Sequence, residues 1–104
     1  MAVVTILDIP GLTREQYERA GQVLPPGPPE GIHFHSCGPI EGGWRIVDVW
    51  ESRSAYDTFL DRIFLPAIRS VGGAEPVRRD VMDVHHAGPV VRAHLPAASV
   101  PGER

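Results

Sequence analysis

The chain has 104 residues, of which 42% are hydrophobic and 22% are charged, and its net charge is −3 with the histidines neutral. These values are typical of one soluble globular domain, and the ten basic residues, all arginines, are dispersed rather than clustered as in nucleic-acid-binding proteins. Cys37 is the single cysteine, no apolar run approaches the ~20 residues that span a bilayer, and the first residues lack a signal-peptide pattern, so we expect a cytoplasmic protein without nucleic-acid or membrane partners.

The first third of the chain predicts a strand followed by a helix. Residues 3–9, VVTILDI, are a short β-branched run that a Pro-Gly pair ends. Thr13 and Gln16 have the spacing of a capping box, and apolar residues recur at helical intervals from Tyr17 onwards, so we expect a helix over residues 14–24. The proline-rich segment LPPGPPEG then ends this helix, because proline cannot donate a helical hydrogen bond.

Two alternating segments in the middle of the chain predict an antiparallel hairpin. The segment IHFHSC follows Gly31, the segment WRIVDVW begins at Trp44, and both alternate apolar and polar residues. The glycine-rich GPIEGG between them is the expected turn.

The second helix carries the strongest periodic signal of the chain. Ser52 or Ser54 is its expected N-cap, and Pro66 is expected to kink it or to split off its last turn. The segment EPVRRDVMDVHH, residues 75–86, then predicts the last strand. The apolar stripe along the helix comprises Tyr56, Phe59, Leu60, Ile63, Phe64, Ala67 and Ile68.

These elements predict an α+β protein with the order β-α-β-β-α-β. Right-handed crossovers turn this order into a ferredoxin-like plait, a four-stranded antiparallel sheet with two helices on one face. We expect this domain over residues 1–86 and a Pro/Ala-rich tail over residues 87–104 that packs on another surface, such as the partner subunit. Apolar residues on both faces of the first and third strands predict that the second sheet face is also buried, and a homodimer packed sheet on sheet would bury it.

Several short motifs lie within residues 31–70: a hairpin turn G-P-x-x-G-G-W, a strand that ends V-W-E-S, and a helix that opens A-Y-x-x-F and reaches L-P-A-I. In these motifs the chain resembles the dimeric α/β-barrel superfamily of ferredoxin-like proteins, which includes the antibiotic-biosynthesis-monooxygenase-like proteins. The order of elements extends the resemblance to residues 1–86. The resemblance implies a homodimer with a ligand cavity in each subunit, between the sheet and the helices.

The resemblance also implies roles for particular residues. In the quinone-forming monooxygenases of this family, a tryptophan and a tyrosine line the cavity, and Trp50 and Tyr56 match their positions. These enzymes carry an asparagine four residues before the tryptophan, whereas this chain has Ile46 there. The departure favours proton-transfer chemistry over oxygenation.

Strand parity places the candidate catalytic residues. Asp48 shares one face of its strand with Ile46. A two-residue turn centred on residues 40–41 would pair His35 with Ile46 and His33 with Asp48 on that face, and one bulge in the turn would reverse this. Asp48 would then orient a histidine and raise its basicity, which makes His35 the first and His33 the second candidate for a general base.

The expected binding site is an apolar pocket for a small hydrophobic molecule. Tyr56 is expected to donate a hydrogen bond to a developing oxyanion. The expected binding wall comprises Trp50, Phe59, Phe64, Ile46 and Phe34.

The sequence is compatible with several functions. The first is a cofactor-independent enzyme that acts on an aromatic or polyketide-like molecule by proton transfer, as in cyclisation or isomerisation. The second is a cofactor-free monooxygenase acting on an electron-rich ring, and the third is a non-catalytic ligand-binding or accessory dimer. A metalloprotein is a weaker alternative, in which His33 and His35 would bind a metal with a third ligand from His85, His86 or His94.

Overall fold

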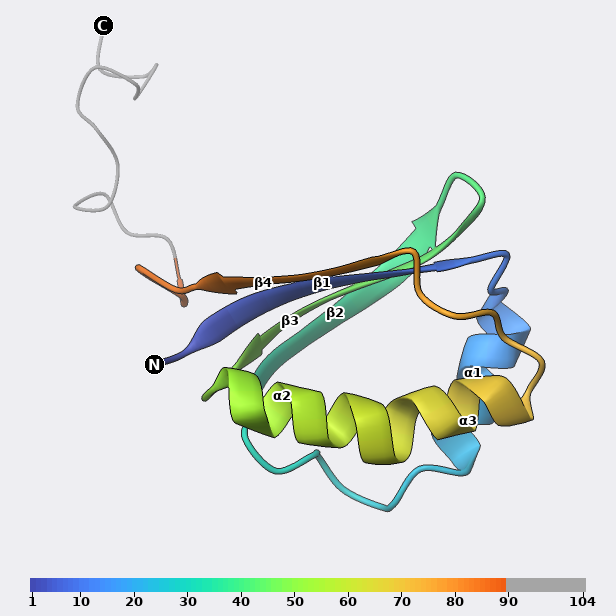
Figure 1. The fold of residues 1–104 in the computed structure, drawn as a ribbon, viewed down its shortest axis with the longest axis horizontal. Coiled ribbons are helices and arrows are strands. Elements are labelled where there is room, and N and C mark those ends of the chain that lie inside the picture. The colour runs from blue at the N-terminus through green and yellow to red at the C-terminus, as the bar shows by residue number, and fades with distance from the viewer. Residues whose placement is uncertain (90–104) are drawn as a thin grey trace, which may run out of the picture.

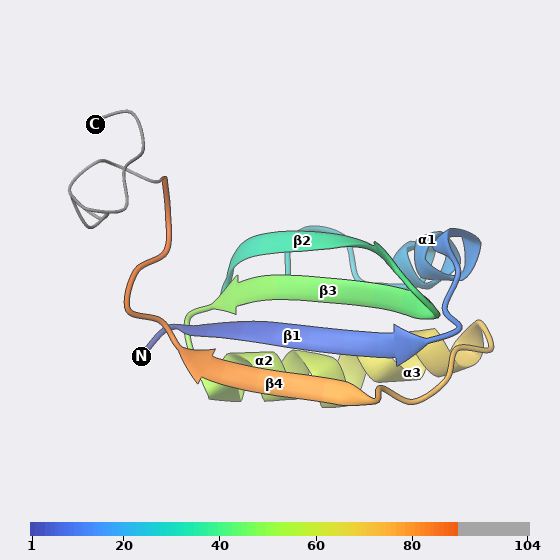
Figure 2. The same cartoon turned by 90° about the horizontal axis from the view of Figure 1, so that it is seen from above.

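The computed structural model describes residues 1–89, which form a four-stranded antiparallel sheet with helices against one face (Figure 1). The strand order is β2-β3-β1-β4, and Figure 2 shows the strands side by side with the helices behind them. This is the predicted ferredoxin-like arrangement. The elements are β1 (Val3–Pro10), α1 (Arg14–Gln22), β2 (Ile32–Ile40), β3 (Gly43–Trp50), α2 (Arg53–Phe59), the π-helical turn η1 (Leu60–Phe64), α3 (Leu65–Ser70) and β4 (Arg78–Asp83).

The ends of several elements differ from the prediction. The capping box of Thr13 and Gln16 starts α1 as expected, but the helix ends at Gln22, two residues before the predicted end. The last strand spans 78–83 rather than 75–86, because only these residues pair with β1. Of the predicted tail, only residues 87–89 are described, so its packing lies outside the described residues.

The hairpin of β2 and β3 has a different register from the predicted one. Its turn consists of Glu41 and Gly42, one residue later than expected, and Gly42 takes a positive φ of 77° that favours glycine. His35 therefore pairs with Asp48 rather than with Ile46. Because the pairing moved by two residues, His35 and Asp48 still share one face of the sheet, as predicted.

A π-helical turn precedes Pro66 in the second helical segment. Proline has no N–H, and in an α-helix its ring would clash with the carbonyl four residues before it, that of Arg62. In η1 the backbone N–H of Leu65 bonds instead to the carbonyl of Leu60, five residues earlier. The helix thus continues from α2 through η1 into α3 (Figure 1), with a π-helical turn next to the position where a kink or a separate last turn was predicted.

The core lies between the inner sheet face and the helices. Trp50, Tyr56 and Ile68 are almost completely buried there, and the core also includes alternate residues of β1 and β3. No helix within residues 1–89 is both long enough and apolar enough to cross a membrane.

Gly43 allows a close approach of the first and third strands, which gives a test of the fold. A Cβ at Gly43 would collide with the backbone oxygen of Ile9 on β1, whereas a Cβ at Gly38 would meet nothing within 4 Å. We therefore expect Gly43→Ala to lower the free energy of unfolding by ~1–3 kcal/mol, measured by urea denaturation. Gly38→Ala is the matched control in the same hairpin, and equal stability of the two variants would contradict the observed packing.

Candidate active site

A cavity of about 350 Å³ lies between the inner sheet face and the helices. Apolar side chains form most of its wall, and the loop between α1 and β2 contributes two prolines. Polar groups come from the strands, from α1 and from α2. The lining residues are Thr5, Leu7, Tyr17, Leu24, Pro28, Pro29, Ile32, His35, Ile46, Asp48, Tyr56, Phe59, Leu60 and Phe64.

Asp48 is the buried polar residue at the centre of the cavity's sheet wall. Its position on β3 places it between His35 on β2 and Thr5 on β1, and it is only 6% exposed. A buried carboxylate is costly unless hydrogen bonds satisfy it. The Nδ1 atom of His35 lies 2.7 Å from one carboxylate oxygen of Asp48, and the indole N–H of Trp50 donates to the other at 3.3 Å.

His35 is held at both ring nitrogens, at the edge of the cavity. The ionised carboxylate of Asp48 can only accept a hydrogen bond, so Nδ1 of His35 carries the proton. The other nitrogen, Nε2, lies 2.9 Å from the hydroxyl of Tyr17. The hydrogen bond to Asp48 raises the pKa of His35, and partial burial opposes this rise. The side chain is 45% exposed, so this base also reaches solvent.

Tyr56 presents a buried hydroxyl that lacks a partner. It is 1% exposed, and its oxygen has no hydrogen-bond partner among the described residues. Burial raises its pKa to about 12, although the nearby charge of Arg79 and the nearby hydroxyl of Thr5 both oppose this rise. Tyr56 therefore remains protonated at neutral pH and can donate a hydrogen bond to a ligand.

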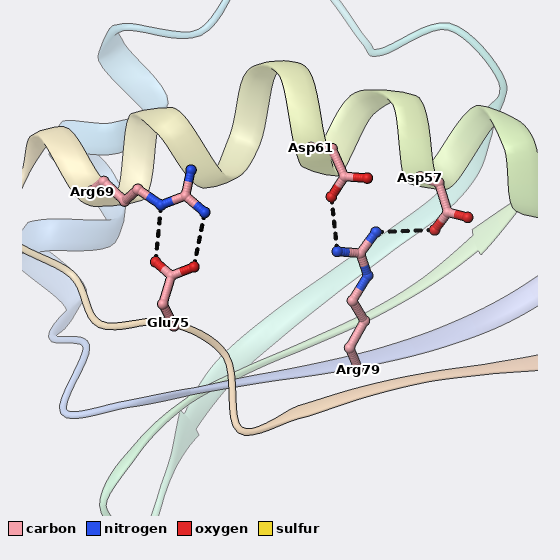
Figure 3. A network of polar contacts seen from close by, with 5 residues as sticks. All are labelled: Asp57, Asp61, Arg69, Glu75 and Arg79. Carbon is pink, nitrogen blue, oxygen red and sulfur yellow. Dashed lines mark hydrogen bonds and ion pairs between the residues drawn. The ribbon is translucent and has the colours of Figure 1, made fainter.

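An ion-pair network fixes the helical wall of the cavity to the sheet edge (Figure 3). Arg79 of β4 donates to Asp57 at 3.0 Å and to Asp61 at 2.8 Å, and its guanidinium carbon lies 5.7 Å from the ring centre of Tyr56. Surface ion pairs contribute little individually. Here one arginine joins two successive helical turns to β4, beside the buried tyrosine.

Three of the predicted binding residues line the cavity, and a fourth lies behind its wall. Ile46, Phe59 and Phe64 are lining residues. Trp50 is fully buried instead, with its ring beside Tyr56 and Phe59 and its N–H on Asp48. The prediction of Trp50 as a wall residue is therefore corrected to that of a support for Asp48.

The structure places two other predicted residues on the opposite side of the sheet. A bulge between Ile32 and Phe34 leaves His33 out of the alternation, and Phe34 alternates with His35. His33 and Phe34 therefore both border the outer sheet face rather than the cavity. Phe34 is 63% exposed there. The structure therefore does not bring His33, the predicted second base, or Phe34, a predicted binding residue, to the cavity.

The same bulge removes the basis of the metal hypothesis. His33 and His35 border different faces, so they cannot form the predicted pair of ligands. Within residues 1–89 no group of three metal-ligating side chains gathers, and His94 lies outside the described residues.

Sequence reasoning missed Tyr17 and Thr5. Tyr17 was recognised only as part of the apolar face of the first helix, yet its hydroxyl reaches His35. A tyrosine on the buried face of a helix that packs on the sheet is a signal that could have found it, because a buried phenol usually requires a partner. Thr5 is buried next to Asp48, where its small polar side chain interrupts the apolar alternation of β1.

Comparison with known proteins establishes the fold relationship. No protein-family model and no curated protein matches the chain. A crystal structure from Chloroflexus aurantiacus J-10-fl, provisionally described as an antibiotic biosynthesis monooxygenase, aligns with a TM-score of 0.59 and 14% identity over 85% of this chain and 98% of that one. A variant of SnoaB, a cofactor-independent oxygenase from Streptomyces nogalater, aligns with a TM-score of 0.58 and 13% identity over 86% of this chain and 98% of its own. The predicted likeness to antibiotic-biosynthesis-monooxygenase-like proteins is thus confirmed for the fold.

The pairing of His35 with Asp48 predicts a specific titration. We expect the pKa of His35 to lie above its ordinary value of 6.5 in the wild type and to fall in Asp48→Asn, which removes the carboxylate. Histidine ring proton shifts measured by NMR between pH 5 and pH 9 check this. Because the folded pKa exceeds the unfolded one, the pair stabilises the fold fully below pH 6.5, and this stabilisation is lost as the pH rises through the folded pKa. A His35 pKa unchanged by Asp48→Asn would contradict the pairing.

Proposed function

We propose that this protein is a cofactor-independent enzyme that performs proton transfer on a small hydrophobic molecule of aromatic or polyketide type. One observation carries the proposal: Asp48 holds His35 as a base beside an apolar cavity, at a distance of 2.7 Å. A histidine imidazole is suited to remove a proton from an acidic carbon or a phenol. Proton removal and return at different atoms would give isomerisation, and attack of the resulting carbanion on a carbonyl carbon of the same molecule would give cyclisation.

The surrounding groups support this chemistry at each stage. Asp48 stabilises the imidazolium that forms when His35 accepts a proton, since the two groups then carry opposite charges. The unpartnered hydroxyl of Tyr56 would donate to the oxygen on which negative charge develops. The mainly apolar wall selects a hydrophobic ligand, and a cavity of about 350 Å³ lies within the usual size range of small-molecule sites.

The shared fold with a cofactor-independent oxygenase favours a second candidate, oxygenation of an electron-rich ring. The first step would be the same, because removal of a proton by His35 leaves an electron-rich carbanion or phenolate. Molecular oxygen, as the co-reactant, would then bond to a ring carbon of this anion and take up a proton to give a hydroperoxide. Loss of water from the hydroperoxide would leave the new C=O bond of a quinone. Consumption of dissolved oxygen during turnover of 1-naphthol would distinguish oxygenation from isomerisation.

A homodimer packed sheet on sheet forms part of the proposal. The outer face of the sheet is not covered by any helix within residues 1–89 (Figure 2). Its apolar side chains lie in the middle of the sheet, with half-buried Val4, Ile6, Val47 and Val49 flanked by exposed Phe34 and Met82. A second copy would remove this apolar surface from water.

The catalytic proposal predicts that His35 variants lose turnover. We expect His35→Asn to slow hydrogen–deuterium exchange of 2-tetralone, a two-ring ketone with acidic C–H groups, by ~10²–10⁴-fold relative to the wild type. Asp48→Asn should also slow it, because the imidazole loses its orienting carboxylate. Exchange in D₂O is followed by mass spectrometry.

His33→Asn is the matched control for this experiment, since His33 lies two residues away on the same strand but borders the other face. The His33→Asn variant should catalyse hydrogen–deuterium exchange of 2-tetralone at the wild-type rate. A binding or accessory module would instead show the buffer rate with all four proteins, and equal rates for His35→Asn and His33→Asn would contradict a catalytic role of His35.

The dimer proposal predicts that a charge on the outer face separates the subunits. Val47→Arg places a guanidinium at the centre of this face, whereas Val23→Arg makes the same change at a position that is 63% exposed beside α1. By light scattering after size exclusion, the wild type and Val23→Arg should have twice the chain mass of 11.4 kDa, and Val47→Arg should have the mass of one chain. A Val47→Arg dimer would contradict the proposed interface.

A further inference from the structure

The hydroxyl of Tyr17 forms a hydrogen bond with the ring nitrogen of His35 that does not contact Asp48. Tyr17 Oη lies 2.9 Å from His35 Nε2, and His35 Nδ1 lies 2.7 Å from Asp48. Because Nδ1 donates to the carboxylate, Nε2 of the neutral imidazole carries a lone pair, and Tyr17 donates its hydroxyl proton to it. Both nitrogens of the proposed base are therefore engaged within the protein itself.

Several contacts hold Tyr17 in this position. The capping box fixes the start of α1, where the side chain of Thr13 accepts from the backbone N–H of Gln16 at 3.1 Å. The side chain of Gln16 in turn donates to the carbonyl of Val71, just after α3, at 3.2 Å. The ring of Tyr17 stacks on Trp44 with 5.1 Å between ring centres. These contacts hold the Tyr17 hydroxyl in a defined position, unlike the hydroxyl of a freely rotating surface side chain.

Tyr17 also lines the cavity together with His35 and Asp48. A ligand that approaches Nε2 of His35 meets the Tyr17 hydroxyl, which already fills that hydrogen-bonding position. We infer that Tyr17 is a further catalytic residue. Its hydroxyl accepts a proton from the ligand while it passes its own proton to Nε2 of His35. This inference rests on the proposed function and deepens it.

The proposed transfer consists of two linked proton movements. An acidic C–H or O–H bond of the ligand breaks, and its electron pair stays on the ligand as an enolate or phenolate. The released proton bonds to Tyr17 Oη while the original hydroxyl proton moves to His35 Nε2. Tyr17 ends neutral, and His35 becomes an imidazolium paired with Asp48. The reverse movement returns a proton to the same or another atom of the ligand.

The burial of Tyr17 requires the two movements to occur together. Partial burial, the nearby thiol of Cys37 and the charge of Asp48 all raise the pKa of Tyr17, so a standing tyrosinate does not form at neutral pH. The hydroxyl acts as a relay only when it gives up one proton as it gains another. His35 supplies the acceptor, and its 45% exposed side chain offers a path from there to solvent.

The substitution Tyr17→Phe tests this role, because it removes one oxygen atom and retains the ring that stacks on Trp44. We expect it to slow hydrogen–deuterium exchange of 2-tetralone by ~10²-fold. The double variant Tyr17→Phe/His35→Asn should exchange no more slowly than His35→Asn alone, because residues that act as one unit do not contribute additively. His33→Asn again serves as the matched control, and thermal unfolding confirms that each variant is folded.

The outcomes separate this inference from the proposed function. Exchange by Tyr17→Phe at or above the wild-type rate, with His35→Asn inactive, would show that the ligand reaches the imidazole directly. That result would overturn the role of Tyr17 and leave the proposed function intact. Equal exchange by the wild type, Tyr17→Phe and His35→Asn would overturn both.

Discussion

A buried carboxylate that needs partners is the constraint on which this site depends. Asp48 is 6% exposed in the middle of the sheet, where an ionised side chain without hydrogen bonds would cost several kcal/mol. His35 and Trp50 provide those hydrogen bonds, each to a different oxygen of the carboxylate. The interaction that makes Asp48 tolerable in the core also selects the tautomer of His35 and turns its second nitrogen away from the carboxylate. Stability and chemistry thus rest on the same contact.

The rest of the fold keeps this contact beside open space. The pairing of β2 with β3 sets His35 opposite Asp48, at an edge strand where the imidazole reaches both the cavity and solvent. Opposite the sheet, the π-helical turn η1 precedes Pro66, and both Leu60 and Phe64 of that turn line the cavity. The bridge from Arg79 to two successive helical turns fixes this wall to β4 (Figure 3). The hairpin of β2 and β3 thus forms part of the sheet wall of the cavity, and the helical segment around η1 forms part of the opposite wall.

Much of the fold could be predicted from the sequence, because its signals are periodic or local. The capping box of Thr13 and Gln16 and the apolar stripe of the second helix led to the correct order of elements. Parity, together with a two-residue turn between the strands, predicted that His35 and Asp48 share one face. The bulge at His33 could not be read in this way, since a single unpaired residue leaves no periodic trace, and it moved His33 to the other face. The contact of Tyr17 with His35 arises from the packing of α1 on the sheet, which the sequence pattern does not specify.

The tautomer of His35 is the most direct test of the claim that Asp48 fixes this histidine as a base. Long-range ¹H–¹⁵N NMR spectra of uniformly ¹⁵N-labelled protein, recorded above the pKa of His35, report which ring nitrogen carries the proton. The hydrogen bond of 2.7 Å to Asp48 predicts a protonated Nδ1 and an unprotonated Nε2. A predominantly protonated Nε2 would mean that the carboxylate does not orient the ring, and would contradict the account.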